Sequence, residues 1–251
     1  MSWFDWLSPK REPSSPLPWA QALAALPILQ GLSVSEQQRL CELGAGLLAH
    51  KTLTQLGVAL TPLQQAKLAL QAVLPILHLG LDWYAGFHEI ILIPEPVTRH
   101  DMVQDEFGLV SEVESVHAGE SWQQGPLVLA RSELAGDGGW DGYNLIIHEL
   151  THKLDMLGGE ADGVPPMRPG MKMSEWRRDF QAAFDEQRVR AERNDAPIDP
   201  YAATHPAEFL AVTTELFFTD PRLLHDVYPA VYCQLTRFFE QDPLTRQPFT
   251  S

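Results

Sequence analysis

The sequence predicts an α+β fold that is mostly helical, with a small β-sheet beside one buried helix. Apolar residues recur at helical spacing in three N-terminal segments, at 19–29, 36–53 and 62–79. Short β-prone runs bounded by Pro and Gly follow, at 88–93, 110–116 and 127–130. Helical periodicity then returns in four segments, at about 143–157, 174–193, 206–218 and 228–240.

Capping residues predict where the N-terminal helices begin and end. Ser35, with Gln38 three residues later, forms a capping-box pattern for the second helix. Thr61 is expected to cap the third helix, and Pro62 suits its first position. Pro75 should kink or end that helix, because proline removes a backbone donor.

The β-prone runs are too brief to predict a parallel α/β core. Gly, Glu and Ser between residues 119 and 125 suit a turn or a bulged connection within the small sheet. We expect an N-terminal helical region, 1–85, packed on a catalytic core, 86–251, in one compact unit.

Charge and cysteine content restrict the class of partner. The net charge of −15 disfavours direct binding to nucleic acid or to an anionic membrane surface, because such binding needs Lys and Arg to neutralise phosphates. Cys41 and Cys233 lie far apart and show no metal-binding spacing, so we expect free thiols and a cytoplasmic protein. The apolar N-terminal residues are expected to dock on the fold, and these are Trp3, Phe4, Trp6 and Leu7.

The segment 144–155 contains His148-Glu149-x-x-His152. Side chains four residues apart project from one helix face, so both imidazoles can bind one tetrahedral zinc ion. Glu149 lies at the edge of that face and can accept a proton from water as a general base. The alternative is a chance match on a surface helix, but the apolar flanks predict burial, which is costly for these three side chains without a metal.

Catalytic zinc needs a third protein ligand, and the sequence after His152 does not supply a further histidine at the required spacing. Glu208 begins an apolar helix, and Glu215 follows two turns later on the same face. Glu208 is either a metal ligand or an N-terminal acid that interacts with the helix dipole. The full set of candidates is Glu160, Glu175, Glu186, Glu192, Glu208 and Glu215.

The motif N-L-I-I-H-E-x-x-H-K-L-D at 144–155, followed by Y-A-A-x-x-P-A-E-x-x-A-V-x-x-E at 201–215, resembles the Mlc titration factor A family of bacterial metallopeptidases. Further stretches at 79–83, 121–126, 161–166 and 239–243 are also similar, so the resemblance covers nearly the whole chain. It implies a gluzincin-like site, related in fold to the catalytic domain of anthrax lethal factor.

By this resemblance, His148, His152 and Glu208 are the zinc ligands, Glu149 is the base, and Tyr201 stabilises the oxyanion. The implied activity is aminopeptidase-type hydrolysis of small peptides. The implied partner is the glucose repressor Mlc, whose binding relieves repression of the glucose phosphotransferase system. His205 occupies a variable position of the second motif and is a competing metal ligand.

Several alternatives remain at this point. The chain could instead be a non-catalytic titration factor with a structural zinc, although three protein ligands are fewer than structural sites usually have. A metallohydrolase acting on other substrates is a further possibility. Asp155 and Glu215 are each either a carboxylate that orients a ligand histidine or a member of a simple ion pair.

Overall fold

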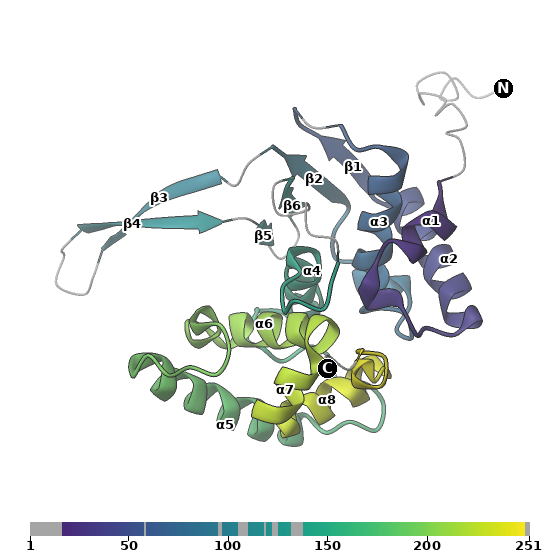
Figure 1. Cartoon of the computed structure of the whole chain (residues 1–251). Coiled ribbons are helices and arrows are strands. Elements are labelled where there is room, and N and C mark those ends of the chain that lie inside the picture. Colours follow the sequence, from purple (N-terminus) through teal and green to yellow (C-terminus); the bar gives the residue numbers. More distant parts are fainter. Residues whose placement is uncertain are drawn as a thin grey trace.

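The computed structural model describes residues 17–57, 59–94, 97–104, 110–117, 119–121, 125–131 and 138–248. For 97–104, 110–117 and 119–121 the description covers the backbone alone. The N-terminal apolar residues whose docking the sequence predicts lie outside these ranges. The predicted α+β, mostly helical fold is confirmed (Figure 1).

The described part of the N-terminal region contains α1 (Trp19–Ala24), α2 (Val34–His50) and α3 (Pro62–Val73). The prediction that 19–29 forms one helix is wrong at its end, because a separate 3₁₀ turn covers Pro27–Leu29. Proline disfavours helical backbone in the residue before it, which separates the two elements. A second 3₁₀ turn, Leu81–Tyr84, follows α3.

Capping explains where α2 and α3 begin. The predicted cap at Ser35 is wrong, because Ser33 caps α2 and forms a reciprocal capping box with Glu36. The predicted cap of α3 is confirmed: the Thr61 side chain accepts from the backbone N–H of Gln64, and the Gln64 side chain accepts from that of Thr61.

In the described part of the chain, the main sheet has four strands in the order β1-β2-β6-β5. Their bounds are Thr52–Gln55 for β1, Glu89–Ile93 for β2, Leu127–Ala130 for β6 and Gly119–Ser121 for β5. The pairs β1–β2 and β2–β6 are parallel, and β5 pairs antiparallel with β6 at the edge. The sequence predicted helix for residues 52–53 and a turn around 119–121, and both expectations are wrong.

Two further strands, β3 (Val97–Gln104) and β4 (Val110–His117), pair with each other in an antiparallel ribbon. Figure 1 shows this ribbon extending away from the main sheet. The run at 110–116 is therefore a strand, as predicted, but it belongs to the ribbon and not to the main sheet.

The described residues after β6 form helices α4 (Leu145–Asp155), α5 (Met173–Glu192), α6 (Pro206–Thr219), α7 (Pro221–Val227) and α8 (Pro229–Phe239). Short 3₁₀ turns cover Met156–Gly158, Pro200–Ala203 and Pro243–Thr245. Proline at the first position begins α6, α7 and α8, where its missing N–H costs no helical hydrogen bond. Helix α7 is an element that the sequence pattern did not predict.

Helix α4 lies at the centre of the molecule, between the sheet and the C-terminal helices (Figure 1). All of its residues are buried, so the polar side chains it carries must find partners inside the protein. Among the helices of the described residues, none combines the length and hydropathy that a bilayer span requires.

Candidate metal centre

The start of α4 is fixed by contacts from two other helices. The Asn144 side chain caps α4 by accepting from the backbone N–H of Ile147 at 3.1 Å. Its amide Nδ2 donates to Gln71 Oε1 of α3 at 2.8 Å, and its backbone N–H donates to Glu215 Oε2 of α6 at 2.9 Å. Both partners are buried, so the position of α4 relative to α3 and α6 is tightly defined.

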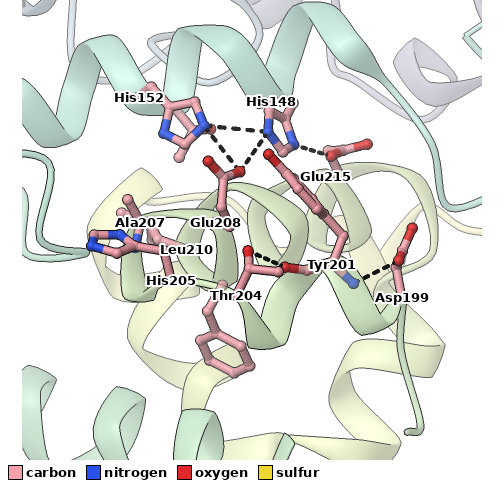
Figure 2. Close-up of polar contacts among 12 residues, drawn as sticks. His148, His152, Asp199, Tyr201, Thr204, His205, Ala207, Glu208, Leu210 and Glu215 are labelled. Atoms are coloured by element: carbon pink, nitrogen blue, oxygen red, sulfur yellow. Dashed lines mark hydrogen bonds and ion pairs between the residues drawn. The ribbon is translucent and has the colours of Figure 1, made fainter. Parts of the chain in front are cut away.

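Two histidines of α4 converge on one glutamate of α6 (Figure 2). His148 Nε2 lies 3.1 Å from Glu208 Oε2, and His152 Nε2 lies 3.3 Å from the same oxygen. The two Nε2 atoms are 3.3 Å apart. Of the six glutamates that the sequence offers as a third ligand, Glu208 is the one in this group.

These three separations match the spacing of ligands around one zinc ion. Ligands at about 2.0–2.1 Å from zinc in a tetrahedron lie about 3.3 Å apart. Two imidazole nitrogens and one carboxylate oxygen are also the donor types that zinc prefers. The residues present therefore fit a metal ion, with His148, His152 and Glu208 as its ligands.

Glu215 contacts His148 on the side opposite to Glu208. Its Oε1 accepts a hydrogen bond from His148 Nδ1, while its Oε2 accepts from Asn144 N. A proton held on Nδ1 leaves the lone pair on Nε2 free to coordinate a metal. The sequence left the role of Glu215 open, and the structure places it as the carboxylate that holds the His148 ring.

The electrostatics of the group favour a positive charge. Burial alone would lower the pKa of His148, but hydrogen bonds to Glu208 and Glu215 outweigh it and raise that pKa to about 10. Burial would raise the pKa of Glu208, whereas its contacts with both histidines lower it well below the usual range. The group thus holds either a proton or a metal cation.

Glu149 lies on α4 next to the metal-ligand group and is 4% exposed. Its Oε2 atom is buried and has no hydrogen-bond partner within the described residues. Burial raises the pKa of its carboxyl above the usual value, although both histidines oppose this shift. A buried carboxylate with a free oxygen and a raised pKa has the properties of a general base.

Tyr201 lies in the 3₁₀ turn that precedes α6, and its ring stacks on His148 with centroids 6.3 Å apart. The side chain is half exposed beside the ligand group (Figure 2). Burial, followed by the charges of Glu208 and Glu149, raises the pKa of the phenol above its usual value. The hydroxyl therefore stays protonated at neutral pH and can donate a hydrogen bond.

Two further residues that the sequence left open have other contacts. Asp155 is fully buried, and its Oδ2 accepts from the backbone N–H of Gly163 at 2.8 Å, so it holds the loop after α4. His205 caps α6, because its Nδ1 accepts from Ala207 N at 3.2 Å. Figure 2 shows its ring directed away from the ligand group, of which it is not a member.

A cavity of about 380 Å³ opens beside the ligand group. His148, Glu149 and Tyr201 line one side of it. The candidate base and the phenol therefore face a space that can receive a substrate.

Sequence comparison identifies the class of this site. A family model described as glucose-regulated metallo-peptidase M90 matches residues 3–240, which is nearly the whole chain. The chain belongs to this family. The resemblance to a bacterial metallopeptidase family that the sequence motifs indicated is therefore confirmed.

Relatives of this M90 peptidase support the same conclusion. Mlc titration factor A of Klebsiella pneumoniae strain 342 is 40% identical over 247 residues, which cover 97% of this chain and 93% of the relative. Proteins of the same name from Escherichia fergusonii and Yersinia pestis are each 41% identical, and the alignments cover 92% and 96% of this chain and 88% and 91% of the relatives.

Some residues that shape the site of this M90 peptidase were not found from the sequence. Asn144 and Gln71 fix α4, but they lie 73 residues apart and carry no shared motif. The Asp199 side chain accepts from Tyr201 N at 2.8 Å and so positions the phenol. Only an Asp-Pro-Tyr sequence before a short turn could have indicated that cap.

Proposed function

We propose that this M90 family member is a zinc-dependent peptidase in which His148, His152 and Glu208 hold the metal. The observation that carries the proposal is the tetrahedral spacing of their three ligand atoms beside the unpartnered Glu149 oxygen. Zinc bound there would supply Lewis-acid polarisation of a carbonyl group and acidification of water.

Glu149 and Tyr201 carry the proposed proton transfer and charge stabilisation. Glu149 Oε2 accepts a proton from the attacking water and returns it to the leaving amine. The Tyr201 hydroxyl donates a hydrogen bond to the oxygen on which negative charge develops. The stacking of Tyr201 on His148 and the hydrogen bond from its backbone N–H to Asp199 support this orientation.

The proposed substrates are small peptides, cleaved in the manner of an aminopeptidase. The cavity volume of about 380 Å³ is near the lower end of ligand pockets, which suits a short peptide segment. We place the protein in the cytoplasm, on the basis of its two free cysteines.

We further propose that the protein binds the transcriptional repressor Mlc and so modulates expression of the glucose phosphotransferase system. The relatives that support this are named Mlc titration factor A, and the alignments cover nearly all of both chains. Repressor binding would use a protein surface, so we expect it to be separable from hydrolysis.

The first experiment is elemental analysis of the wild-type protein and of Glu208→Ala, together with cleavage of alanyl and related chromogenic substrates. We expect about one zinc per chain in the wild type, and loss of both zinc and activity in the variant. Glu192→Ala removes an exposed glutamate outside the site and serves as the control. Zinc-free wild type that stays inactive after zinc is added would contradict the proposal.

Glu149→Gln separates the two proposed functions. We expect its kcat/KM to fall by about 10²- to 10⁴-fold while zinc content stays at the wild-type level. Retained binding of Mlc by this variant would show that repressor binding does not need turnover. Wild-type rates in the variant would show that Glu149 is not the base. Zinc-loaded wild type that binds Mlc but hydrolyses no substrate would favour the alternative, a titration factor with a structural zinc. Cleavage of non-peptide esters alone would indicate a different metallohydrolase.

A further inference from the structure

The cavity beside the metal-ligand group combines an apolar wall with acidic side chains. Its apolar lining comes mainly from Leu145, Ile198, Val212, Leu216 and Leu223. The cavity is also lined by five carboxylates, those of Asp141, Glu149, Asp199, Glu215 and Asp220. None of its described lining residues is Lys or Arg. An apolar wall that ends in unpaired negative charge suits a ligand with an apolar stem and a cationic group.

Three of these carboxylates, Asp141, Asp199 and Asp220, have no cationic partner among the residues that the structure describes. Each accepts a hydrogen bond from a backbone N–H through its Oδ1 atom. Asp141 accepts from Tyr143 at 3.3 Å, Asp199 from Tyr201 at 2.8 Å, and Asp220 from Leu223 at 3.3 Å. Asp220 Oδ1 also accepts from Gln247 Nε2 at 3.1 Å. Within the described part of the chain, none of the three forms an ion pair with a Lys, Arg or His side chain.

A second observation points to a ligand in this cavity. Glu149 is 4% exposed and lines the cavity, and its buried Oε2 atom lacks a partner in the described structure. The charge of a divalent metal ion would be balanced by Glu208 and Glu149. The three aspartates would then remain unbalanced even when the metal is bound.

We infer that this cavity binds a cationic nitrogen of the peptide substrate, with Asp141, Asp199 and Asp220 as the groups that select it. The inference rests on the proposed peptidase function and names the class of substrate. Two parts of a peptide carry such a nitrogen, the terminal α-ammonium and the side chain of Lys or Arg.

Four p-nitroanilides distinguish the two sources of positive charge. They are those of lysine, norleucine, α-N-acetyl-lysine and α-N-acetyl-norleucine, because norleucine keeps the stem of lysine without its ammonium. We expect kcat/KM for a substrate with the preferred cation to exceed that of its neutral counterpart at least about tenfold at low salt. This preference should shrink as ionic strength rises.

If the lysine substrates are cleaved faster than the norleucine substrates, both with and without the acetyl group, the preferred cation is the side-chain ammonium. If the lysine and norleucine substrates are cleaved at equal rates and acetylation abolishes cleavage of both, the preferred cation is the α-ammonium. Cleavage of all four substrates at similar rates would overturn the inference while leaving the proposed peptidase function intact.

Asparagine variants test the three aspartates directly. Asp141→Asn, Asp199→Asn and Asp220→Asn keep the oxygen that accepts the backbone hydrogen bond and remove the charge. We expect each variant to reduce the cation preference severalfold. Asp141→Asn and Asp220→Asn should change kcat/KM less for a substrate that lacks the preferred cation, whereas Asp199→Asn should also lower that value if it shifts Tyr201. The matched control is Asp185→Asn on α5, which makes the same charge change on a residue that does not line the cavity.

Binding separates failure of this inference from failure of the proposed function. The amides of the same four amino acids are titrated by calorimetry into zinc-loaded Glu149→Gln protein and into the same protein with all three aspartates replaced. The inference is supported if the cationic amides bind more tightly than the neutral ones and if this difference disappears when the three aspartates are replaced. That result supports the inference even if no substrate is hydrolysed. Equal affinity in both proteins would show that the aspartates do not select a cation.

Discussion

Glu215 links a metal ligand to the start of its own helix. It contacts His148 Nδ1 with one oxygen and Asn144 N with the other. We expect Glu215→Gln to weaken zinc binding by about 10- to 100-fold, because the charged acceptor for His148 is lost while an acceptor for Asn144 N remains. Competition with a chromophoric chelator measures the affinity, and Glu186→Gln on α5 is the control.

Unchanged zinc affinity in Glu215→Gln would show that this carboxylate does not position His148. A parallel loss of helical content would indicate a structural role instead. Circular dichroism of the zinc-loaded variant therefore accompanies the affinity measurement.

Asp155 makes stability depend on pH. Burial raises its pKa from 3.8 to about 6, even though Gly163 N donates to it. Because the folded pKa is higher than the unfolded one, the native state binds the proton more tightly, and stability falls as pH rises from about 4 to 6. We expect Asp155→Asn to remove this loss of stability between pH 4 and 6. The size of the pKa shift limits that loss to about 3 kcal/mol.

The measurement is urea unfolding of wild type and Asp155→Asn at pH 4, 5, 6 and 7. Asparagine keeps an oxygen to accept from Gly163 N, so the difference between the two proteins isolates the titration. A difference in unfolding free energy that does not change with pH would contradict the prediction.

At the residue scale, the sequence predicted the two histidines and the base because their geometry is local to one helix turn. The residues alone left the carboxylate ligand open, and only the family resemblance assigned it to Glu208. Glu208 lies 60 residues from His148, and no local pattern specifies how α4 and α6 pack. The same limit applies to Asp141, Asp199 and Asp220, which reach one cavity from separate segments.

Among the elements, the loop between α4 and α5 is held to the start of α6. Gly163 has φ +78°, and a Cβ atom there would lie 2.7 Å from the backbone oxygen of Pro206, the first residue of α6. We expect Gly163→Ala to lower the unfolding free energy by about 1–3 kcal/mol and to weaken zinc binding, because Glu208 follows two residues after Pro206.

Gly170→Ala provides the matched control for this prediction. Gly170 has φ +85°, but a Cβ atom there would meet nothing within 4 Å, so alanine adds backbone strain without a clash. Thermal unfolding and zinc affinity are measured for both variants. Equal losses in the two variants would show that the contact with Pro206 has no effect.

The start of α3 was predicted correctly because capping and periodicity agree there, and α5 matches its periodic segment although no side chain caps it. β1 was missed because Leu53 continues the apolar spacing of α2, and its strand geometry depends on pairing with β2. β5 was missed because its glycine suggested a turn, whereas pairing with β6 holds it extended. Both errors arise from non-local pairing, which sequence periodicity does not report.

For the whole molecule, the N-terminal region and the core share one sheet. β1 pairs with β2, and Gln71 of α3 bonds Asn144 at the start of α4. We expect the chain to unfold in a single transition, and a free zinc concentration of 100 times Kd to stabilise it by about 2.7 kcal/mol. That corresponds to a rise in Tm of about 5–10 °C.

Far-UV circular dichroism and tryptophan fluorescence, each with and without zinc, test this expectation. Coincident curves that shift together would show one cooperative unit. Two transitions, of which zinc moves only one, would instead indicate separate domains divided near the predicted boundary at residue 85.

The metal-ligand group also has a consequence for the chain as a polymer. An ion bound by His148 and Glu208 joins positions 60 residues apart, and so acts as a reversible cross-link around the loop after α4 and the whole of α5. Such a cross-link exists only while the chain is folded, and loss of the ion frees the enclosed segment to open locally. Zinc supply would then govern how long each molecule survives proteolysis as well as whether it is active.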